Sequence, residues 1–296
     1  MPGRSAGTAE WDARLSVPGS PVCAPDWLAL REAADAAARA TELVGEVRAH
    51  LAPGARPDAP TVIRDLGCGS GSMGRWLAGR LPGPQLWILC DRDPGLLARA
   101  GAGMPSVAAD GAAVTARTWE GDLTGLRAEE LAGTSLVTAS AVLDLLTFEE
   151  VDGLAAACVQ AGCAALLTLT VTGRVEIDPH DPLDVEFAAA FDAHQRRSTG
   201  ARRLLGPDAG AAAVEAFTRR GAAVRTRPSP WRLGADQAEL AQEWLRGWIG
   251  AACVQRPDLE RHAAAYLGRR LDACSAGELR VVVDHVDVLA LPADAS

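Results

Sequence analysis

The sequence predicts a doubly wound α/β fold, in which helices cover both faces of a mostly parallel sheet. Short runs of aliphatic and β-branched residues alternate with helical patterns from residue 61 onward. The run Ala164–Val171 is apolar on both faces, as a central parallel strand should be. A glycine-rich turn, Gly67–Gly71, joins the first strand to the next helix. We therefore expect seven strands, an N-terminal helical cover and a two-helix insertion before the last strand.

The N-terminal part is expected to lie outside the sheet. Residues 1–25 hold prolines, glycines and small residues without a period, which predicts a flexible arm. Residues 26–60 are expected to form the helical cover, in a helix capped by Asp26 that runs to Leu51 and ends before Pro53-Gly54.

The α/β domain is expected over residues 61–296. Its strands are expected at Thr61–Leu66, Gln85–Cys90, Val114–Trp119, Ser135–Ala139, Ala164–Val171, Ala223–Thr226 and Leu279–Leu291. Helices are expected at Ser72–Leu81, Asp93–Ala100, from Thr147 past Cys158, Pro207–Arg220, Asp236–Ala252 and Asp258–Ala273. The long connection over 172–206 is expected to be a lid or substrate-binding segment, and residues 231–275 form the expected helical insertion.

The composition of the 296-residue chain excludes several functions. The net charge is −9 and the sequence pI about 5.1, so we expect no nucleic-acid or membrane partner. No apolar run reaches the roughly 20 residues that span a bilayer, and no signal pattern is present, so the cytoplasm is expected. The sequence contains no lysine, which excludes Schiff-base catalysis, pyridoxal-phosphate anchoring and the Walker A lysine.

Three acidic side chains stand where neighbouring strands end. Asp65 precedes the glycine turn, Asp91 closes the second strand, and Asp122 follows the third. Ligands of doubly wound sheets bind outside the carboxyl ends of the strands. A carboxylate at Asp91 suits the two hydroxyls of a ribose, and one at Asp122 can accept from the exocyclic amine of an adenine. The pattern favours a nucleoside-containing ligand.

The glycine turn and the acidic strand ends together resemble the class I S-adenosylmethionine-dependent methyltransferases. The turn reads Asp65-Leu66-Gly67-Cys68-Gly69-Ser70-Gly71, and the resemblance covers roughly residues 60–230 with the closing strand as the seventh. It implies S-adenosylmethionine as cofactor and methyl transfer to O, N or C of a small molecule. The implied cofactor-binding residues are Asp65, Gly67, Gly69 and Gly71 around the methionine part, Asp91 at the ribose, Arg92 along the adenine, Asp122 and Leu123 at the adenine edge and face, and Ser140 in the stretch that lines the sulfonium.

Two other functions stay open at this point. Gly69-x-Gly71-x-x-Gly74 also satisfies the dinucleotide fingerprint, so an NAD(P)-dependent oxidoreductase is the main alternative. One observation opposes it: the carboxylate of Asp65 would attract a cofactor amine but repel a pyrophosphate. The third interpretation is an S-adenosylmethionine-binding protein without turnover, which would serve as a sensor or partner subunit.

Three residues are candidate general bases, which methyl transfer needs only where the acceptor must lose a proton. His180 lies between two Asp-Pro steps in the long connection, His194 follows Phe187 and Phe191 at helical spacing, and Asp144 follows the fourth strand. Each has a structural interpretation as well, as a turn residue, a helix residue or a loop brace.

No metal is expected. Asp178, His180 and Asp181 could be taken for a metal cluster. The catechol-type methyltransferases that use a divalent cation resemble this fold, but their pattern includes an Asp-Asn pair after the fifth strand, and this chain has no asparagine. The partner expected is a small-molecule substrate, and a homodimer is compatible with the sequence. Trp231, Trp244 and Trp248 are expected to pack a helix onto the sheet flank, with an aromatic wall for a flat acceptor as the alternative.

Overall fold

The structure is a computed structural model that describes residues 23–52 and 59–293. Most of the expected arm, residues 1–22, lies outside the described residues, as do Pro53-Gly54 and the last three residues.

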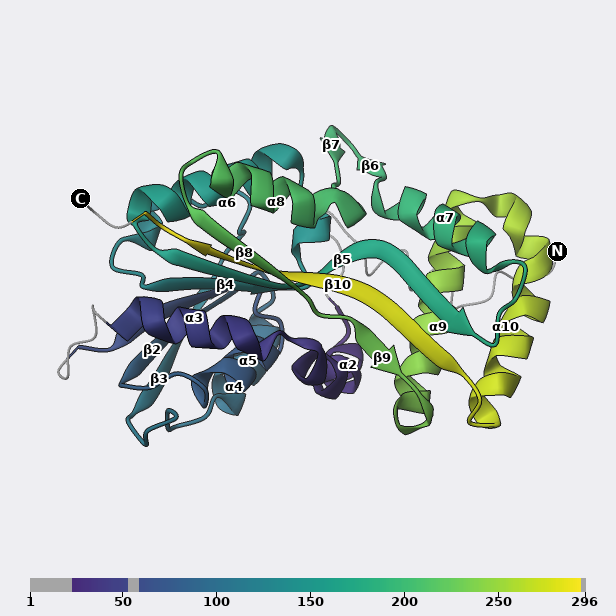
Figure 1. The fold of residues 1–296 in the computed structure, drawn as a ribbon, viewed down its shortest axis with the longest axis horizontal. Coiled ribbons are helices and arrows are strands. Elements are labelled where there is room, and N and C mark those ends of the chain that lie inside the picture. The colour runs from purple at the N-terminus through teal and green to yellow at the C-terminus, as the bar shows by residue number, and fades with distance from the viewer. Residues whose placement is uncertain (1–22, 53–58, 294–296) are drawn as a thin grey trace.

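One mixed sheet of eight strands runs through the molecule (Figure 1). Its order is β3-β2-β1-β4-β5-β10-β8, and β9 pairs with β10 beside this path. β1 to β5 are parallel, and β10 is antiparallel to β5, β8 and β9. The strands are β1 (Thr61–Leu66), β2 (Gln85–Asp91), β3 (Val114–Glu120), β4 (Leu136–Ser140), β5 (Ala164–Asp178), β8 (Ala223–Pro228), β9 (Trp231–Leu233) and β10 (Arg280–Leu291). The doubly wound, mostly parallel sheet is confirmed, with short β9 as one strand more than the seven expected.

Helices cover both faces of this sheet, as Figure 1 shows, with α6 and α8 on one face and α3, α4 and α5 on the other. The helices are α2 (Pro25–Ala38), α3 (Thr41–Leu51), α4 (Ser72–Ala78), α5 (Pro94–Gly103), α6 (Phe148–Ala161), α7 (Asp184–Gln195), α8 (Ala209–Thr218), α9 (Ala238–Gln255) and α10 (Glu260–Ser275). Two predicted helix starts are confirmed: Asp93 caps α5 through Leu96 N–H, and the Thr147–Glu150 capping box opens α6. The expected two-helix insertion before the last strand is formed by α9 and α10.

A third apolar core lies beyond the sheet proper, where α7, α9 and α10 pack against the far halves of β5 and β10. Figure 1 shows these long strands curving into that group of helices. Phe187, Trp248 and Tyr266 are buried there, and the rings of Phe187 and Tyr266 stack at 4.6 Å. The insertion therefore forms a lobe with its own core, joined to the sheet by continuous strands.

The fifth strand is longer than the sequence predicts. It does not end at Val171 but continues to Asp178, which pairs with Arg280 of β10. Exposed Arg174 and Glu176 alternate there with more buried Val175 and Ile177, which is the period of a strand with one solvated face. The first part of the expected lid segment is therefore sheet, and the rest holds α7 and a hairpin of β6 (Ser198–Thr199) and β7 (Arg202–Arg203).

The prediction of a single helix from Asp26 to Leu51 is wrong, because the helix is interrupted at Arg39 and Ala40, between α2 and α3. The Ala40 N–H donates to Asp287 Oδ2 at 2.8 Å, so it leaves the helical hydrogen-bond ladder. Asp26 is not the cap either: α2 begins at Pro25, one residue earlier, with Ala24 at the cap position.

Candidate functional site

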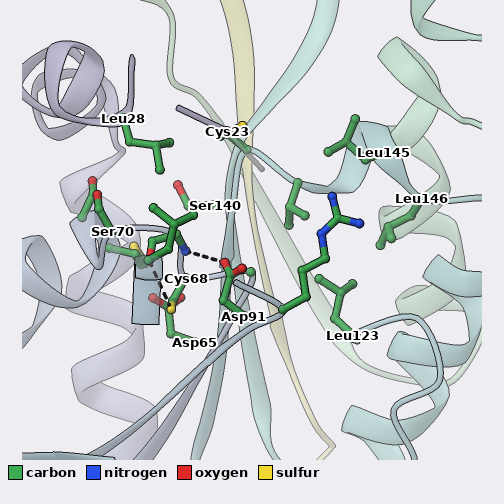
Figure 2. A pocket seen from close by; sticks show the side chains of 18 of the residues that line it. Cys23, Leu28, Asp65, Cys68, Ser70, Asp91, Leu123, Ser140, Leu145 and Leu146 are labelled. Carbon is green, nitrogen blue, oxygen red and sulfur yellow. Dashed lines mark hydrogen bonds between the residues drawn. The ribbon is translucent and has the colours of Figure 1, made fainter. Parts of the chain in front are cut away.

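A cavity of about 210 Å³ opens at the carboxyl ends of β1, β2 and β4, where a doubly wound sheet binds its ligands (Figure 2). The helix α2 and the residues just before it close its other side. Its lining includes all nine residues predicted to bind a cofactor except Gly71, together with Cys23, Leu28, Arg31, Asp35, Arg39, Met73, Val142, Leu145, Leu146 and Arg202. Figure 2 shows Asp65, Asp91, Leu123 and Ser140 gathered around it.

The glycine turn has the backbone that its sequence predicts. Gly67, Gly69 and Gly71 have φ angles of 62°, 53° and 88°, in the left-handed region that favours glycine. A Cβ on Gly69 would lie 3.3 Å from Leu28 of α2, so this turn and α2 approach each other closely. Gly71 does not line the cavity but supports it: a Cβ there would lie 3.0 Å from the Cα of Ala100.

Asp65 is a buried carboxylate at the end of β1, with 0% of its surface exposed. Its Oδ1 accepts from the Thr138 hydroxyl at 2.7 Å, while Oδ2 has no hydrogen-bond partner among the described residues. Burial raises the pKa of Asp65 to about 7, against the opposing effects of Thr138 and the Arg39 guanidinium. An acid with a free oxygen at the cavity wall is suited to receive a cationic group.

Asp91 holds the turn from the neighbouring strand. Its Oδ2 accepts from Gly69 N–H at 2.8 Å, and its Oδ1 accepts from Asp93 N–H at 3.0 Å. Each carboxylate oxygen keeps a lone pair for a further donor such as a hydroxyl. On the same side, Asp122 Oδ1 accepts from Thr124 N–H at 2.9 Å, and Leu123 presents its side chain to the cavity (Figure 2).

The most buried cation of the cavity, Arg39, was missed by the sequence reasoning. Only 3% of Arg39 is exposed, and its Nη2 donates to the hydroxyls of Ser72 and Ser140, each at 3.1 Å. Its Nε and Nη1 are buried without a hydrogen-bond partner in the described part of the chain. Because a buried unpaired N–H is costly, these two nitrogens indicate a missing acceptor.

Arg39 belongs to a stripe along α2 that faces the cavity at helical spacing, with Leu28, Arg31 and Asp35. Arg31 Nε donates to Asp35 Oδ2 at 3.0 Å, and Asp35 Oδ1 also accepts from the Trp231 indole at 3.0 Å. The guanidinium of Arg31 lies 4.8 Å from the Trp231 ring centroid. Aromatic contact and the ion pair together fix Arg31 at the cavity wall.

The three candidate bases lie in different places, and none of them lines the cavity. Asp144 comes nearest: it is half-buried in a 3₁₀ turn, Leu143–Leu145, beside Leu145 and Leu146 of the lining, and burial raises its pKa. His180 is exposed in the turn after β5. The part of β5 that separates this turn from Thr168, the strand partner of Ser140 in the cavity lining, is about 30 Å long. His194 is buried near the end of α7, with 1% exposed.

Of the three tryptophans expected in the helical insertion, Trp244 and Trp248 follow the packing interpretation, whereas Trp231 lies in strand β9 and contacts Arg31 and Asp35 of the cavity wall. The rings of Trp244 and Trp248 stack at 5.2 Å, and Trp248 lies 6.1 Å from Phe187, all inside the lobe core and outside the cavity lining. Within residues 23–52 and 59–293, no group of three or more His, Cys, Asp or Glu side chains could hold a metal ion. The described part of the chain also contains no helix long and apolar enough to cross a bilayer.

Searches against known proteins match solved structures only. No family model matches the chain, and no curated protein does. It is similar to a SAM-dependent methyltransferase from Thiobacillus denitrificans in complex with S-adenosylhomocysteine, with 15% identity over 90% of this chain and 98% of that one and a TM-score of 0.45. A SAM-dependent methyltransferase from Geobacter sulfurreducens, also in complex with S-adenosylhomocysteine, gives 16% identity, the same coverage and a TM-score of 0.44. A cyclopropane synthase from Mycobacterium tuberculosis gives 13% identity over 83% of each chain and a TM-score of 0.40.

Proposed function

We propose that this protein is an S-adenosylmethionine-dependent methyltransferase that acts on a small-molecule acceptor. One observation carries the proposal: a single cavity brings together a carboxylate with a free oxygen, a buried guanidinium with two free nitrogens and the carboxylate of Asp91. Their charges complement the three polar parts of the cofactor, namely its ammonium, its carboxylate and its ribose hydroxyls. The expected resemblance to class I methyltransferases points to the same ligand.

Each polar part has a matching group in the cavity. Asp65 Oδ2 would accept from the ammonium, and Arg39 Nε and Nη1 would donate to the carboxylate. Asp91 would accept from the ribose hydroxyls while it holds the turn through Gly69. Asp122, Leu123 and Arg92 would surround the adenine. A dinucleotide fits this set less well, because its pyrophosphate would lie at the buried carboxyl of Asp65.

Methyl transfer depends mainly on the alignment of the methyl donor with the acceptor. When bound, S-adenosylmethionine supplies a methyl group that its sulfonium has already activated. The turn, α2 and Ser140 hold the donor side in one position, and alignment of this kind can contribute about 7–11 kcal/mol to a barrier. Of the three candidates we keep Asp144 as the proposed general base. It adjoins the cavity lining, and burial raises its pKa toward neutral pH, where a general base is more effective.

Donor binding and turnover test the proposal. We expect calorimetry to give micromolar binding of S-adenosylhomocysteine and no binding of NADH, because the charge pattern suits only the first. Asp91→Ala should weaken S-adenosylhomocysteine at least tenfold, whereas Asp258→Ala, which removes an exposed aspartate after α9, should not. Binding of NADH alone, or unchanged affinity in Asp91→Ala, would refute the assignment.

Transfer of a labelled methyl group to acceptors in a metabolite extract separates an enzyme from a sensor. We expect a labelled product of low molecular mass, since the net charge of −9 opposes nucleic acid and anionic membranes. We also propose the cytoplasm as the compartment and leave a homodimer as the assembly to test by light scattering. Donor binding with no labelled product from any extract would favour a non-catalytic binding protein.

A further inference from the structure

The side chain of Asp287 in β10 ties together three segments that are far apart in the sequence. Its Oδ2 accepts from Ala40 N–H at 2.8 Å, and its Oδ1 accepts from Leu169 N–H at 2.7 Å and from the Ser229 hydroxyl at 2.5 Å. Asp287 has 0% of its surface exposed and does not line the cavity. Burial of a carboxylate is costly unless it is hydrogen-bonded, and these three donors offset that cost.

Two of the three segments lead directly to the cavity. Ala40 follows Arg39, whose guanidinium lies in the cavity wall. Leu169 follows Thr168, whose hydroxyl donates to Ser140 Oγ at 3.0 Å, and Ser140 accepts from Arg39 as well. Asp287 therefore binds the backbone N–H of the residue that follows Arg39 and of the residue that follows Thr168.

The backbone around Asp287 is irregular in a way that serves this contact. The register of β5 against β10 shifts between Val286 and Val288, which leaves Asp287 at a bulge. Leu169 has a φ of 56°, a left-handed conformation that is costly for a branched side chain. That conformation directs its N–H to Asp287. Bulges and strained residues of this kind gather near functional sites, where they direct side chains.

Charge gives Asp287 a second link to Arg39. Burial opposes the charge on Arg39, and the carboxylates of Asp35, Asp65 and Asp287 favour it. The Arg39 charge in turn opposes the upward effect of burial on the pKa of Asp287. The two buried groups thus support each other's ionised forms.

We propose that Asp287 is a positioning residue for the cofactor. The Asp287 carboxylate holds Arg39 in place through its hydrogen bond from Ala40 N–H and through its negative charge. In that position Arg39 keeps Nε and Nη1 available to the carboxylate of an amino-acid-bearing nucleoside thioether. This proposal rests on the proposed function and adds a residue from the last strand, 247 positions from Ala40, to the site.

Two ligands that differ in the amino-acid part provide the test. S-Adenosylhomocysteine carries the carboxylate, and 5′-methylthioadenosine has the same adenosine and sulfur without it. Asp287→Asn keeps the size of the side chain but replaces one acceptor oxygen with an amide that cannot accept. We expect calorimetry on the full chain to show S-adenosylhomocysteine weakened about tenfold or more, and 5′-methylthioadenosine changed less than about twofold.

Ser229→Ala is the matched control, because it removes one hydrogen bond to the same carboxylate but keeps its charge and its bond to Ala40. We expect it to leave both affinities within about twofold. In an Arg39→Met background, Asp287→Asn should have no further effect on S-adenosylhomocysteine, since the group that it positions is gone.

Ala40→Pro keeps the test decisive if Asp287→Asn does not fold. It replaces the N–H that Asp287 accepts with the proline Cδ, which separates Ala40 from the carboxylate, and the φ of Ala40, −70°, already suits proline. It should reproduce the selective loss of S-adenosylhomocysteine. Equal weakening of both ligands, or no weakening of either in Asp287→Asn and Ala40→Pro, would overturn the proposal. A wild-type protein that binds neither ligand would instead overturn the proposed function.

Discussion

Donor affinity should depend on pH through Asp65, whose pKa burial raises to about 7. In the free protein Asp65 is mostly protonated at pH 6 and mostly ionised at pH 8. The proposed ammonium at Oδ2 interacts favourably only with the ionised form, so binding lowers the pKa and releases a proton. Affinity should therefore increase as pH rises from 6 to 8 and level off above it.

The size of this effect follows from the pKa. If binding shifts the pKa of Asp65 to about 5, the ratio of affinities between pH 8 and pH 6 is roughly tenfold, or about 1.4 kcal/mol. About half a proton per site should leave at pH 7. Titration calorimetry of S-adenosylhomocysteine in buffers of different ionisation enthalpy measures both quantities.

Asp65→Asn is the matched variant, because it keeps the size of the side chain and the acceptor for Thr138 but cannot ionise. It should remove the pH dependence and the proton release, and should bind the donor product more weakly at pH 8. A wild-type affinity that is flat between pH 6 and 8, or an equal pH slope in Asp65→Asn, would refute the reasoning about Asp65.

Three further variants test other parts of the structure. Gly69→Ala should cost about 1–2 kcal/mol of stability and reduce S-adenosylhomocysteine affinity, because its φ of 53° is unfavourable for alanine and its Cβ would lie 3.3 Å from Leu28; thermal unfolding and calorimetry check this, and unchanged affinity would contradict the close approach. His180→Ala should leave kcat within about twofold, since His180 is exposed outside the cavity lining, and a hundredfold loss in the labelled-methyl assay would restore it as a base. Trp248→Ala should destabilise the protein by about 3–5 kcal/mol in denaturant unfolding, because it empties the lobe core, and a loss below 1 kcal/mol would argue against that core.

The parts of the site that depend on neighbouring residues in the chain were predictable. The glycine turn needs three left-handed residues between a strand and a helix, and its sequence shows them at the right spacing. Asp65, Asp91 and Asp122 lie at, or just after, the carboxyl ends of consecutive strands of a parallel sheet, so strand alternation alone brings them to one edge.

The rest depends on contacts that no local pattern reveals. In the sequence, Arg39 looks like one more residue of an alanine-rich helix. In the structure α2 ends at Ala38, Arg39 lines the cavity, and the next N–H, that of Ala40, donates to Asp287 far along the chain. His180 lies outside the cavity lining because β5 continues to Asp178 before the turn that holds the histidine. The alternation of Val175 and Ile177 with charged residues was a usable signal for that longer strand.

The most direct measurement of the central claim is a crystal structure of the protein grown with S-adenosylhomocysteine. The proposed function predicts an adenosine beside Leu123 with its ribose on Asp91, and an amino-acid tail between Asp65 and Arg39. Crystals that hold the compound elsewhere, or that leave Asp91 without a ribose contact, would contradict it.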